Sequence, residues 1–416
     1  MKKFKISILY STLIFMAFSS CSVFQKANIN VGKWRGNIVM DSADKSLVLP
    51  FNMVINQNYE NKYRIVITNS EEMIPVTEIE CNGKNAVIKL PVFKDEINVN
   101  CVSKDSLVGE YIHYGSKSKY SMPFFAVFDK ADRFPDATQK PFMNISGRWE
   151  TTVQPGDSNE YKIIGEFRQK GNHLDGTFLT ASGDYRFLEG AVSGKDVMLS
   201  CVDGTHTLLF KAKISEDSTL ENGILVGGPK WRERWRAVRN PAAELADPEL
   251  QSQIKDSTEE INFSLSGLDG KNVSLSDMKY QGKPVIIQIM GSWCPNCMDE
   301  TKFFSEIYNS YKKRGLEIMG LCFESADFNE SKDRIKRFVN ALNANYDFLY
   351  AGETGNKYVM QTLPFLKEFK GYPTTIYLNK QHKVFKIYTG FSGPGTGVYY
   401  EKLKSEIINS IEKILM

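Results

Sequence analysis

A short apolar run followed at once by two closely spaced cysteines is the feature that most restricts how this 416-residue chain can fold. Residues 284–290 read PVIIQIM, which has the length and composition of a buried central strand. The heptapeptide GSWCPNC follows at 291–297, and apolar residues then recur at helical spacing as far as Arg314. The pattern predicts a strand that ends where a helix begins, with both cysteines on the first helical turn.

This placement suits thiol–disulfide chemistry. Cys294 and Cys297 are separated by two residues, so they can close a disulfide on one helical turn without moving the backbone. The free N–H groups and the positive end of the helix dipole favour the thiolate form of Cys294. We therefore expect Cys294 to attack a substrate disulfide and Cys297 to resolve the mixed disulfide. Pro295 fits the first helical position, where its missing N–H costs nothing.

Two other interpretations of the cysteine pair are weaker. A zinc site would need a second pair of ligands, and the sequence contains no second CxxC or CxxH and only four scattered histidines. An inert structural disulfide would not require a strand, a tryptophan and an amphipathic helix in this order. We expect no metal and no dissociable cofactor.

The length of the chain allows two or three domains. Short strand-like runs separated by turn residues fill residues 31–240, which predicts antiparallel β structure. Residues 260–416 instead alternate strand and helix patterns, which is typical of an α/β layer fold. The polar segment 241–259 between them contains two prolines and reads as a linker. The net charge of +3 is spread along the chain, so no nucleic-acid partner is expected.

The β-rich region repeats itself. Gly32-Lys33-Trp34 resembles Gly147-Arg148-Trp149, and two further weak matches follow in the same order at nearly the same offset. We interpret the region as two divergent β units, residues 31–142 and 143–240, each shaped like a barrel or a sandwich.

The N-terminus has the layout of a secretory signal. Three lysines precede an apolar run at residues 6–18, and Ser19-Ser20-Cys21 follows. Small residues directly before a cysteine resemble a bacterial lipoprotein signal. Residues 1–20 would then be removed, Cys21 would carry the lipid, and residues 21–30 would be a tether. This predicts a periplasm-facing protein anchored to a cell-envelope membrane; the alternative is a plain signal peptide.

Four cysteines remain after Cys21 and the close pair are assigned. They are Cys81, Cys101, Cys201 and Cys322, and four cysteines allow three connectivities. A Cys81–Cys101 bridge is one possibility, because these two flank neighbouring strand-like runs. The other is that each is a small buried apolar residue, which we favour for Cys201 and Cys322.

Residues 260–416 resemble the TlpA/ResA-like branch of the thioredoxins, which are membrane-tethered extracytoplasmic thiol–disulfide oxidoreductases. The resemblance rests on GSWCPNC and on its lead-in, which runs from Phe263-Ser264-Leu265 through Asp269-Gly270-Lys271 to Gly282-Lys283-Pro284-Val285. It implies a thioredoxin fold, protein thiol or disulfide substrates, an upstream electron-donor oxidoreductase, and reduction rather than oxidation. The β-rich half resembles the extra region of long thioredoxin-like lipoproteins of Bacteroidetes-type bacteria.

The resemblance also implies a second landmark, a cis-proline that faces the redox pair. Pro373 in the segment Gly371-Tyr372-Pro373-Thr374-Thr375 matches it, just before a strand-like run. The backbone of Tyr372 would then face Cys294, where an extended substrate could pair with it. Trp293, Tyr372 and Pro373 are the expected substrate-binding residues.

In this branch an acid follows the strand after the redox helix, and Glu324 matches it. It would shuttle a proton or tune the thiols; the alternative is a surface carboxylate on a loop. Thioredoxins proper place a buried acid six residues before the first cysteine, where this chain has Gln288. Proton transfer must therefore come from elsewhere, from Glu324 or from water.

Two other functions remain open at this point. A thiol peroxidase would need Thr or Ser three residues before the reactive cysteine, where this chain has Gly291. A ligand-binding or sensing lipoprotein would use the β units as its receptor, with an auxiliary thioredoxin domain. The glycine-rich segment 390–397 lacks the ending of a phosphate loop and is expected to border the substrate groove.

Overall fold

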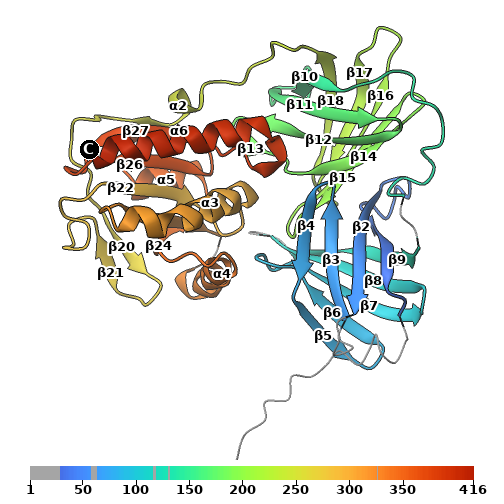
Figure 1. Cartoon of the computed structure of the whole chain (residues 1–416), viewed down its shortest axis with the longest axis horizontal. Coiled ribbons are helices and arrows are strands. Elements are labelled where there is room, and N and C mark those ends of the chain that lie inside the picture. The colour runs from blue at the N-terminus through green and yellow to red at the C-terminus, as the bar shows by residue number, and fades with distance from the viewer. Residues whose placement is uncertain (1–28, 58–62, 116–118, 130–131, 326) are drawn as a thin grey trace, which may run out of the picture.

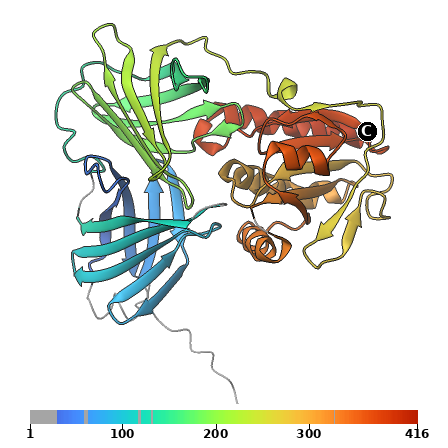
Figure 2. The ribbon, with the colours of Figure 1, turned by 180° about the vertical axis from the view of Figure 1, so that it is seen from behind.

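The computed structural model describes residues 29–57, 63–115, 119–129, 132–325 and 327–416. The expected signal segment and the lipidated Cys21 lie outside these residues. Two β units stand together at one end of the molecule, and an α/β unit forms the other end (Figure 1). The same division is seen from behind (Figure 2), where the β12–β13 region of the second β unit extends toward the α/β unit.

The first β unit is a nine-stranded antiparallel sheet in the order β4-β3-β2-β1-β9-β8-β7-β6-β5. Its strands alternate buried and partly exposed residues, so one face of the sheet encloses an apolar core that includes Trp34, Phe51 and Phe124. The strands are β1 (Gly32–Val39), β2 (Val48–Gln57), β3 (Tyr63–Asn69), β4 (Glu72–Val76), β5 (Glu78–Asn82), β6 (Asn85–Lys89), β7 (Glu96–Ser103), β8 (Ser106–Tyr114) and β9 (Lys119–Phe128).

The second β unit is also a nine-stranded antiparallel sheet, in the order β11-β10-β18-β17-β16-β15-β14-β12-β13. An additional pairing between β11 and β12 closes this sheet into a barrel. The strands are β10 (Gly147–Val153), β11 (Tyr161–Lys170), β12 (His173–Thr180), β13 (Gly183–Asp184), β14 (Leu188–Ser193), β15 (Asp196–Val202), β16 (Thr207–Ile214), β17 (Leu220–Val226) and β18 (Arg232–Arg239).

The two β units share one design, as the sequence repeat predicts. The first strand of each unit pairs with the second and with the last strand of the same unit. The Trp34 indole N–H donates to the carbonyl of Asn30 at 3.0 Å, and the Trp149 indole N–H donates to the carbonyl of Ile145 at 2.8 Å. Both tryptophans are fully buried. The predicted barrel-like β region is confirmed.

The C-terminal unit is a seven-stranded mixed sheet in the order β21-β20-β24-β23-β22-β26-β27. Helices α3, α4 and α6 contribute to the apolar core on one face, and α5 to the core on the other. The elements are α2 (Pro248–Gln251), β19 (Gln253–Ile254), β20 (Ser264–Gly267), β21 (Asn272–Ser274), β22 (Val285–Met290), α3 (Pro295–Lys312), β23 (Glu317–Glu324), α4 (Phe328–Ala341), β24 (Asp347–Glu353), α5 (Asn356–Thr362), β25 (Leu366–Glu368), β26 (Thr374–Leu378), β27 (Val384–Thr389), a 3₁₀ turn (Pro394–Thr396) and α6 (Val398–Leu415).

The predicted strand and helix around the cysteines are confirmed. Every residue of β22 is buried, which explains why its sequence is apolar except for Gln288, whose amide is hydrogen-bonded. Helix α3 begins at Pro295 with Cys294 as its N-cap, so the redox loop occupies the junction between strand and helix.

Three of the remaining cysteines are free and buried: Cys101, Cys201 and Cys322. The prediction that Cys201 and Cys322 are small buried residues is confirmed. The alternative of a Cys81–Cys101 bridge is wrong, because the Cys101 thiol is free in the first unit's core. Burial raises the pKa of Cys101 to about 11, which keeps this thiol protonated.

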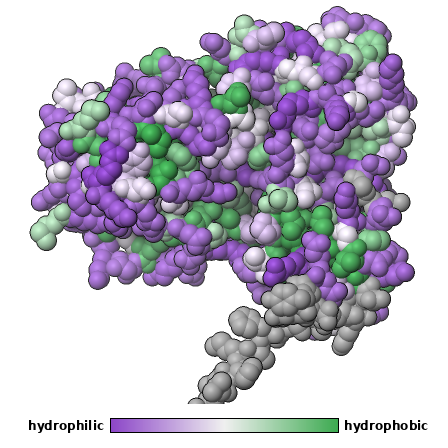
Figure 3. All heavy atoms as spheres, in the orientation of Figure 1, coloured by the Kyte–Doolittle hydropathy of each residue, from purple (hydrophilic) through white to green (hydrophobic). Residues whose placement is uncertain are grey.

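The surface is mainly hydrophilic on the face shown in Figure 3, with apolar residues in small separate patches. In the parts of the chain that the structure describes, no helix is both long and apolar enough to cross a membrane.

One buried arginine joins all three units. Arg186, which follows β13, is only 5% exposed. Its guanidinium forms ion pairs with Glu72 of the first β unit and with Asp299 of α3, and lies 3.6 Å from Asp203 of its own unit. Burial raises the pKa of Glu72 and of Asp299, and the positive charge of Arg186 opposes that rise. Arg186 is therefore the main counter-charge of Glu72 and Asp299.

Replacing Arg186 with methionine should destabilise the protein by about 3–5 kcal/mol, because it leaves buried carboxylates without a counter-charge. Urea unfolding followed by tryptophan fluorescence measures the loss, and small-angle scattering shows whether the units separate. The control is Arg168→Met, since Arg168 pairs with Glu71 on the surface, where both side chains are about 70% exposed and the expected loss is under about 1 kcal/mol. Equal losses in the two variants would contradict the prediction.

Candidate active site

The two cysteines of the redox loop form a disulfide at the start of α3. Their Cα atoms are 5.2 Å apart, and the backbone N–H of Cys297 points at the sulfur of Cys294 at 3.1 Å. Cys294 is 5% exposed, whereas Cys297 is fully buried. The sulfur of Cys294 is therefore nearer the surface than that of Cys297. The helix N–H directed at the Cys294 sulfur would stabilise its thiolate form.

Trp293 and Tyr372 meet beside the disulfide. Their rings contact edge to face with centroids 5.3 Å apart, and the Tyr372–Pro373 peptide bond is cis, as predicted. The Trp293 indole N–H donates to the carbonyl of Phe323 at 3.0 Å, and the Tyr372 hydroxyl accepts the N–H of Gly355 at 3.3 Å. The three expected substrate-binding residues therefore lie together at the redox loop.

Glu324 lies at the end of β23 and is 1% exposed, so the alternative of a surface carboxylate is wrong. It accepts the backbone N–H of Ser292 at 2.7 Å and the Ser292 hydroxyl at 2.9 Å. Burial raises its pKa to about 7, although these hydrogen bonds and the charges of Arg334 and Lys94 oppose the rise. Glu324 thus holds the loop two residues before Cys294.

A second buried acid, Glu300, was missed by the sequence analysis. It lies one helical turn after Cys297 and is 2% exposed. The Thr375 hydroxyl donates to it at 2.6 Å and the side-chain amide of Gln288 donates at 2.8 Å. Burial raises the pKa of Glu300 to about 7, and these two hydrogen bonds oppose the rise.

Gln288 links this acid to the redox pair. Its amide nitrogen also lies 3.4 Å from the carbonyl oxygen of Cys297. In thioredoxins proper an acid occupies the position of Gln288. Here Gln288 instead holds an acid, Glu300, that helix α3 supplies. The available signal was the spacing of Cys297 and Glu300, since residues three apart share a helix face.

The β12–β13 hairpin of the second β unit, with its tip at residues 181–184, lies against the loops around the disulfide. We call it the covering hairpin. A Cβ atom at Gly183 would lie 2.1 Å from the side-chain amide of Asn296, the residue between Pro295 and Cys297. With the Asn296 amide oriented so that both its nitrogen and its oxygen find partners, the amide nitrogen donates to the carbonyl of Asp184 at 3.2 Å. The amide oxygen accepts the backbone N–H of Asp184 at 3.3 Å. The backbone of the hairpin is therefore hydrogen-bonded to the redox loop through the side chain of Asn296.

The same hairpin contacts two further loops. A Cβ atom at Gly371 would lie 3.3 Å from the Cβ of Ser182, and one at Gly390 would lie 2.9 Å from the Ser182 carbonyl carbon. The backbone N–H of Gly393 donates to the Asp184 carboxylate at 2.6 Å. The segment 390–397, expected to border a substrate groove, is thus covered by the chain's own hairpin.

Comparison with known proteins finds similarity to thiol-disulfide oxidoreductases. Residues 258–387 match the AhpC/TSA family. Thiol-disulfide oxidoreductase ResA of Bacillus subtilis is 27% identical over 140 residues, which are 34% of this chain and 70% of ResA. ResA of Bacillus thuringiensis is 38% identical over 85 residues, which are 20% of this chain and 45% of that protein. A thiol:disulfide interchange protein of Chlorobium tepidum has a solved structure with 17% identity and a TM-score of 0.29, covering 42% of this chain and all of that one.

The C-terminal unit is therefore a thioredoxin-like domain of a disulfide oxidoreductase. Within that class the protein is TlpA/ResA-like, as its sequence predicts. The matches to ResA cover at most 34% of the chain.

Replacing Glu300 with glutamine should remove the pH dependence of the resolving step. Burial raises the pKa of Glu300 to about 7, and Gln288 connects it to the backbone of Cys297; if Glu300 is the base for Cys297, the rate with a small disulfide should rise as the pH passes through about 7. Glu300→Gln should lose this rise and react about 100-fold more slowly at pH 8. Stopped-flow tryptophan fluorescence of the reduced protein, mixed with the small disulfide at a series of pH values, measures this rate.

The matched control is Glu306→Gln, which changes an exposed carboxylate on the same helix. It should keep the wild-type pH profile. A wild-type profile in Glu300→Gln would show that Glu300 is structural only.

Proposed function

We propose that this protein is an extracytoplasmic reductase of protein disulfides, anchored through lipid on Cys21, that acts through Cys294 and Cys297. The observation that carries the proposal is the disulfide at the N-terminus of α3, with one sulfur near the surface and the other fully buried. The ResA relatives, which are named thiol-disulfide oxidoreductases, support the same chemistry.

The reaction moves two electrons between sulfur atoms. The Cys294 thiolate attacks one sulfur of the substrate disulfide, the substrate S–S bond breaks, and the departing thiolate takes up a proton. Cys297 then loses its proton, for which the buried Glu300 carboxylate is the base, and attacks the Cys294 sulfur. The second substrate thiol leaves with a proton, and the Cys294–Cys297 disulfide remains.

The groups around the disulfide have separate roles in this scheme. Glu324 is a positioning residue, because it holds both the N–H and the hydroxyl of Ser292 just before the attacking cysteine. Trp293, Tyr372 and Pro373 form the substrate wall beside the disulfide, and the hairpin residue Ser182 covers the part of this wall next to Gly371. No dissociable cofactor is required, since both electrons pass through sulfur.

The reductase direction requires an upstream dithiol oxidoreductase that reduces the Cys294–Cys297 disulfide after each turnover. The placement outside the cytoplasm is supported by the signal-like order of residues 1–20 and Cys21. We divide the chain accordingly into β units at 31–142 and 143–240, a linker at 241–259 and the redox domain at 260–416.

One contact argues against the thiol peroxidase alternative. A Cβ atom at Gly291 would lie 2.3 Å from the Trp293 indole nitrogen. The Thr or Ser that such a peroxidase needs at this position would therefore displace the indole.

Replacing Cys297 with serine should trap the substrate, because the mixed disulfide on Cys294 can no longer be resolved. A disulfide-bridged peptide incubated with reduced Cys297→Ser should give a covalent adduct that mass spectrometry locates on Cys294. The Cys294→Ser/Cys297→Ser double variant is the matched control and should give none. An adduct on Cys297 in the single variant Cys294→Ser, with none in Cys297→Ser, would reverse the assigned roles.

A further inference from the structure

A cavity of about 350 Å³ lies between the β units and the redox loop. Its floor includes Ser292 and Trp293, the two residues that precede Cys294, and α4 adds Arg334. The first β unit contributes Lys94 with its loop neighbours and residues of β8 and β9, and the second contributes the β15–β16 and β17–β18 loops. All three units therefore build this cavity, and it adjoins the redox loop directly.

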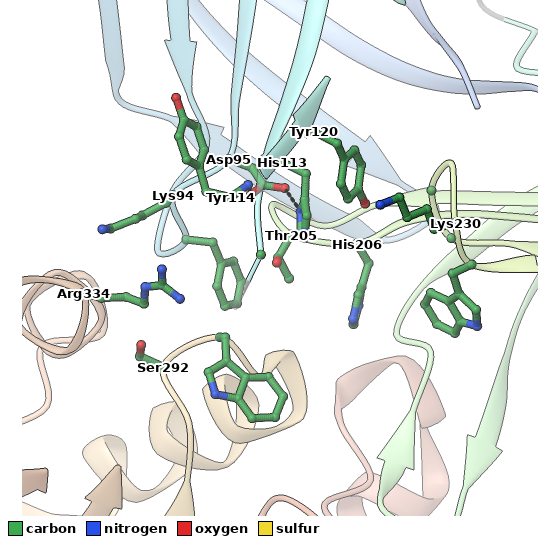
Figure 4. A pocket seen from close by; sticks show the side chains of 16 residues that line it. Lys94, Asp95, His113, Tyr114, Tyr120, Thr205, His206, Lys230, Ser292 and Arg334 are labelled. Carbon is green, nitrogen blue, oxygen red and sulfur yellow. Dashed lines mark hydrogen bonds and ion pairs between the residues drawn. The ribbon is translucent and has the colours of Figure 1, made fainter. Parts of the chain in front are cut away.

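The cavity is lined by cations whose charge is not balanced locally. Figure 4 shows Lys94 and Arg334 on one side and Lys230 on the other, whereas the His206 ring is paired with the buried Asp203 at 3.1 Å. Within the described part of the chain, no carboxylate forms an ion pair with Lys94, Lys230 or Arg334. The charges of Lys94 and Arg334 act on the buried Glu324 from a distance, without an ion pair.

The single acid of the cavity wall, Asp95, is already engaged. It is 2% exposed and bonds to the Tyr111 hydroxyl at 2.6 Å, the His113 ring at 2.7 Å and the Tyr114 N–H at 2.9 Å. Its negative charge is therefore directed inward, and the lining presents net positive charge to a ligand.

Aromatic side chains complete the walls. Trp293 and Trp231 lie at the cavity, and a Cβ atom at Gly227 would lie 2.1 Å from the Trp231 ring. A Cβ atom at Gly228 would lie 2.5 Å from the Tyr120 hydroxyl. Only glycine at these two positions lets the β17–β18 loop pack so closely on the aromatic rings. The result is a shaped pocket with apolar walls and a few cationic groups, which is typical of a ligand site.

The covering hairpin explains why this cavity matters to the reaction. Ser182 and Gly183 occupy the space beside Gly371, Gly390 and Asn296, so a substrate cannot lie on those loops while the hairpin is in place. A substrate disulfide would therefore reach the redox loop through the cavity that Ser292 and Trp293 line.

We propose that this cavity binds carboxylate groups that flank the substrate's disulfide, so that the β units select acidic disulfide substrates for Cys294. The proposal rests on the proposed reductase function and names its substrate class. Lys94 and Lys230 hold the carboxylates, and Trp231 and Trp293 contact the apolar part of the substrate.

Three disulfide-bridged peptides that differ only in the two residues flanking each cysteine, as Glu, Gln or Lys, test the proposal. The full-length protein should reduce the Glu peptide with a kcat/KM about tenfold higher than the Gln peptide, the size expected of two partly screened ion pairs. The Lys peptide should be slowest. The preference for the Glu peptide should shrink as salt is added, because salt screens the ion pairs. A small disulfide with two carboxylates should also react faster than a neutral small disulfide with hydroxyl groups if the carboxylates alone are recognised; equal rates would show that a peptide chain is needed.

The double variant Lys94→Gln/Lys230→Gln should lose the preference between Glu and Gln peptides. The control Lys271→Gln, at an exposed turn of the redox domain, should retain it. The double variant's rate with the Gln peptide, compared with that of the wild type, shows whether removing the charge of Lys94 changes the reaction through Glu324. Reduction of all peptides without a charge preference, or a preference that survives the double variant, would overturn the substrate class alone. Reduction of none of them would overturn the reductase function as well.

Discussion

The buried guanidinium of Arg186 is the interaction on which the rest of the structure depends. It lies among carboxylates from the first β unit, the second β unit and the redox helix, and burial makes each of these charges costly without it. Because Asp299 lies two residues after Cys297, this network fixes the β units against the face of the domain that carries the disulfide. The covering hairpin and the cationic cavity both follow from that docking.

The redox chemistry is built around the same junction. A fully buried Cys297 needs a nearby base, and burial gives Glu300 a pKa of about 7, at which it can accept a proton near neutral pH. Glu324, with a similar pKa, fixes the loop that presents Cys294. In the proposed scheme the thioredoxin-like domain carries the thiol–disulfide exchange and the proton transfer, and the β units select which disulfide reaches it.

Much of the fold could be predicted because its signals are local. The run at 284–290, the CPNC turn and the helical spacing after it specify β22 and α3, and the two Gly-x-Trp motifs mark the first strands of the two β units. The hairpin contacts and the Arg186 pairs with Glu72 and Asp299 join residues more than 100 positions apart, and no short sequence pattern shows them. Glu300 was not predicted for a different reason: thioredoxins proper hold the acid on the strand at the position of Gln288, whereas here the helix supplies it and Gln288 bonds to it. The Cys81–Cys101 alternative rested on neighbouring strands alone, which cannot show whether two thiols meet.

The most direct test of the account is the reduction potential of the Cys294–Cys297 pair in the full-length protein. Thiol trapping after equilibration in glutathione and dithiothreitol buffers measures it. We expect a potential close to that of thioredoxin, about −270 mV, which suits a reductase that an upstream dithiol reduces again. A potential near −120 mV would describe a strong oxidant that installs disulfides, and would contradict the direction proposed for this protein.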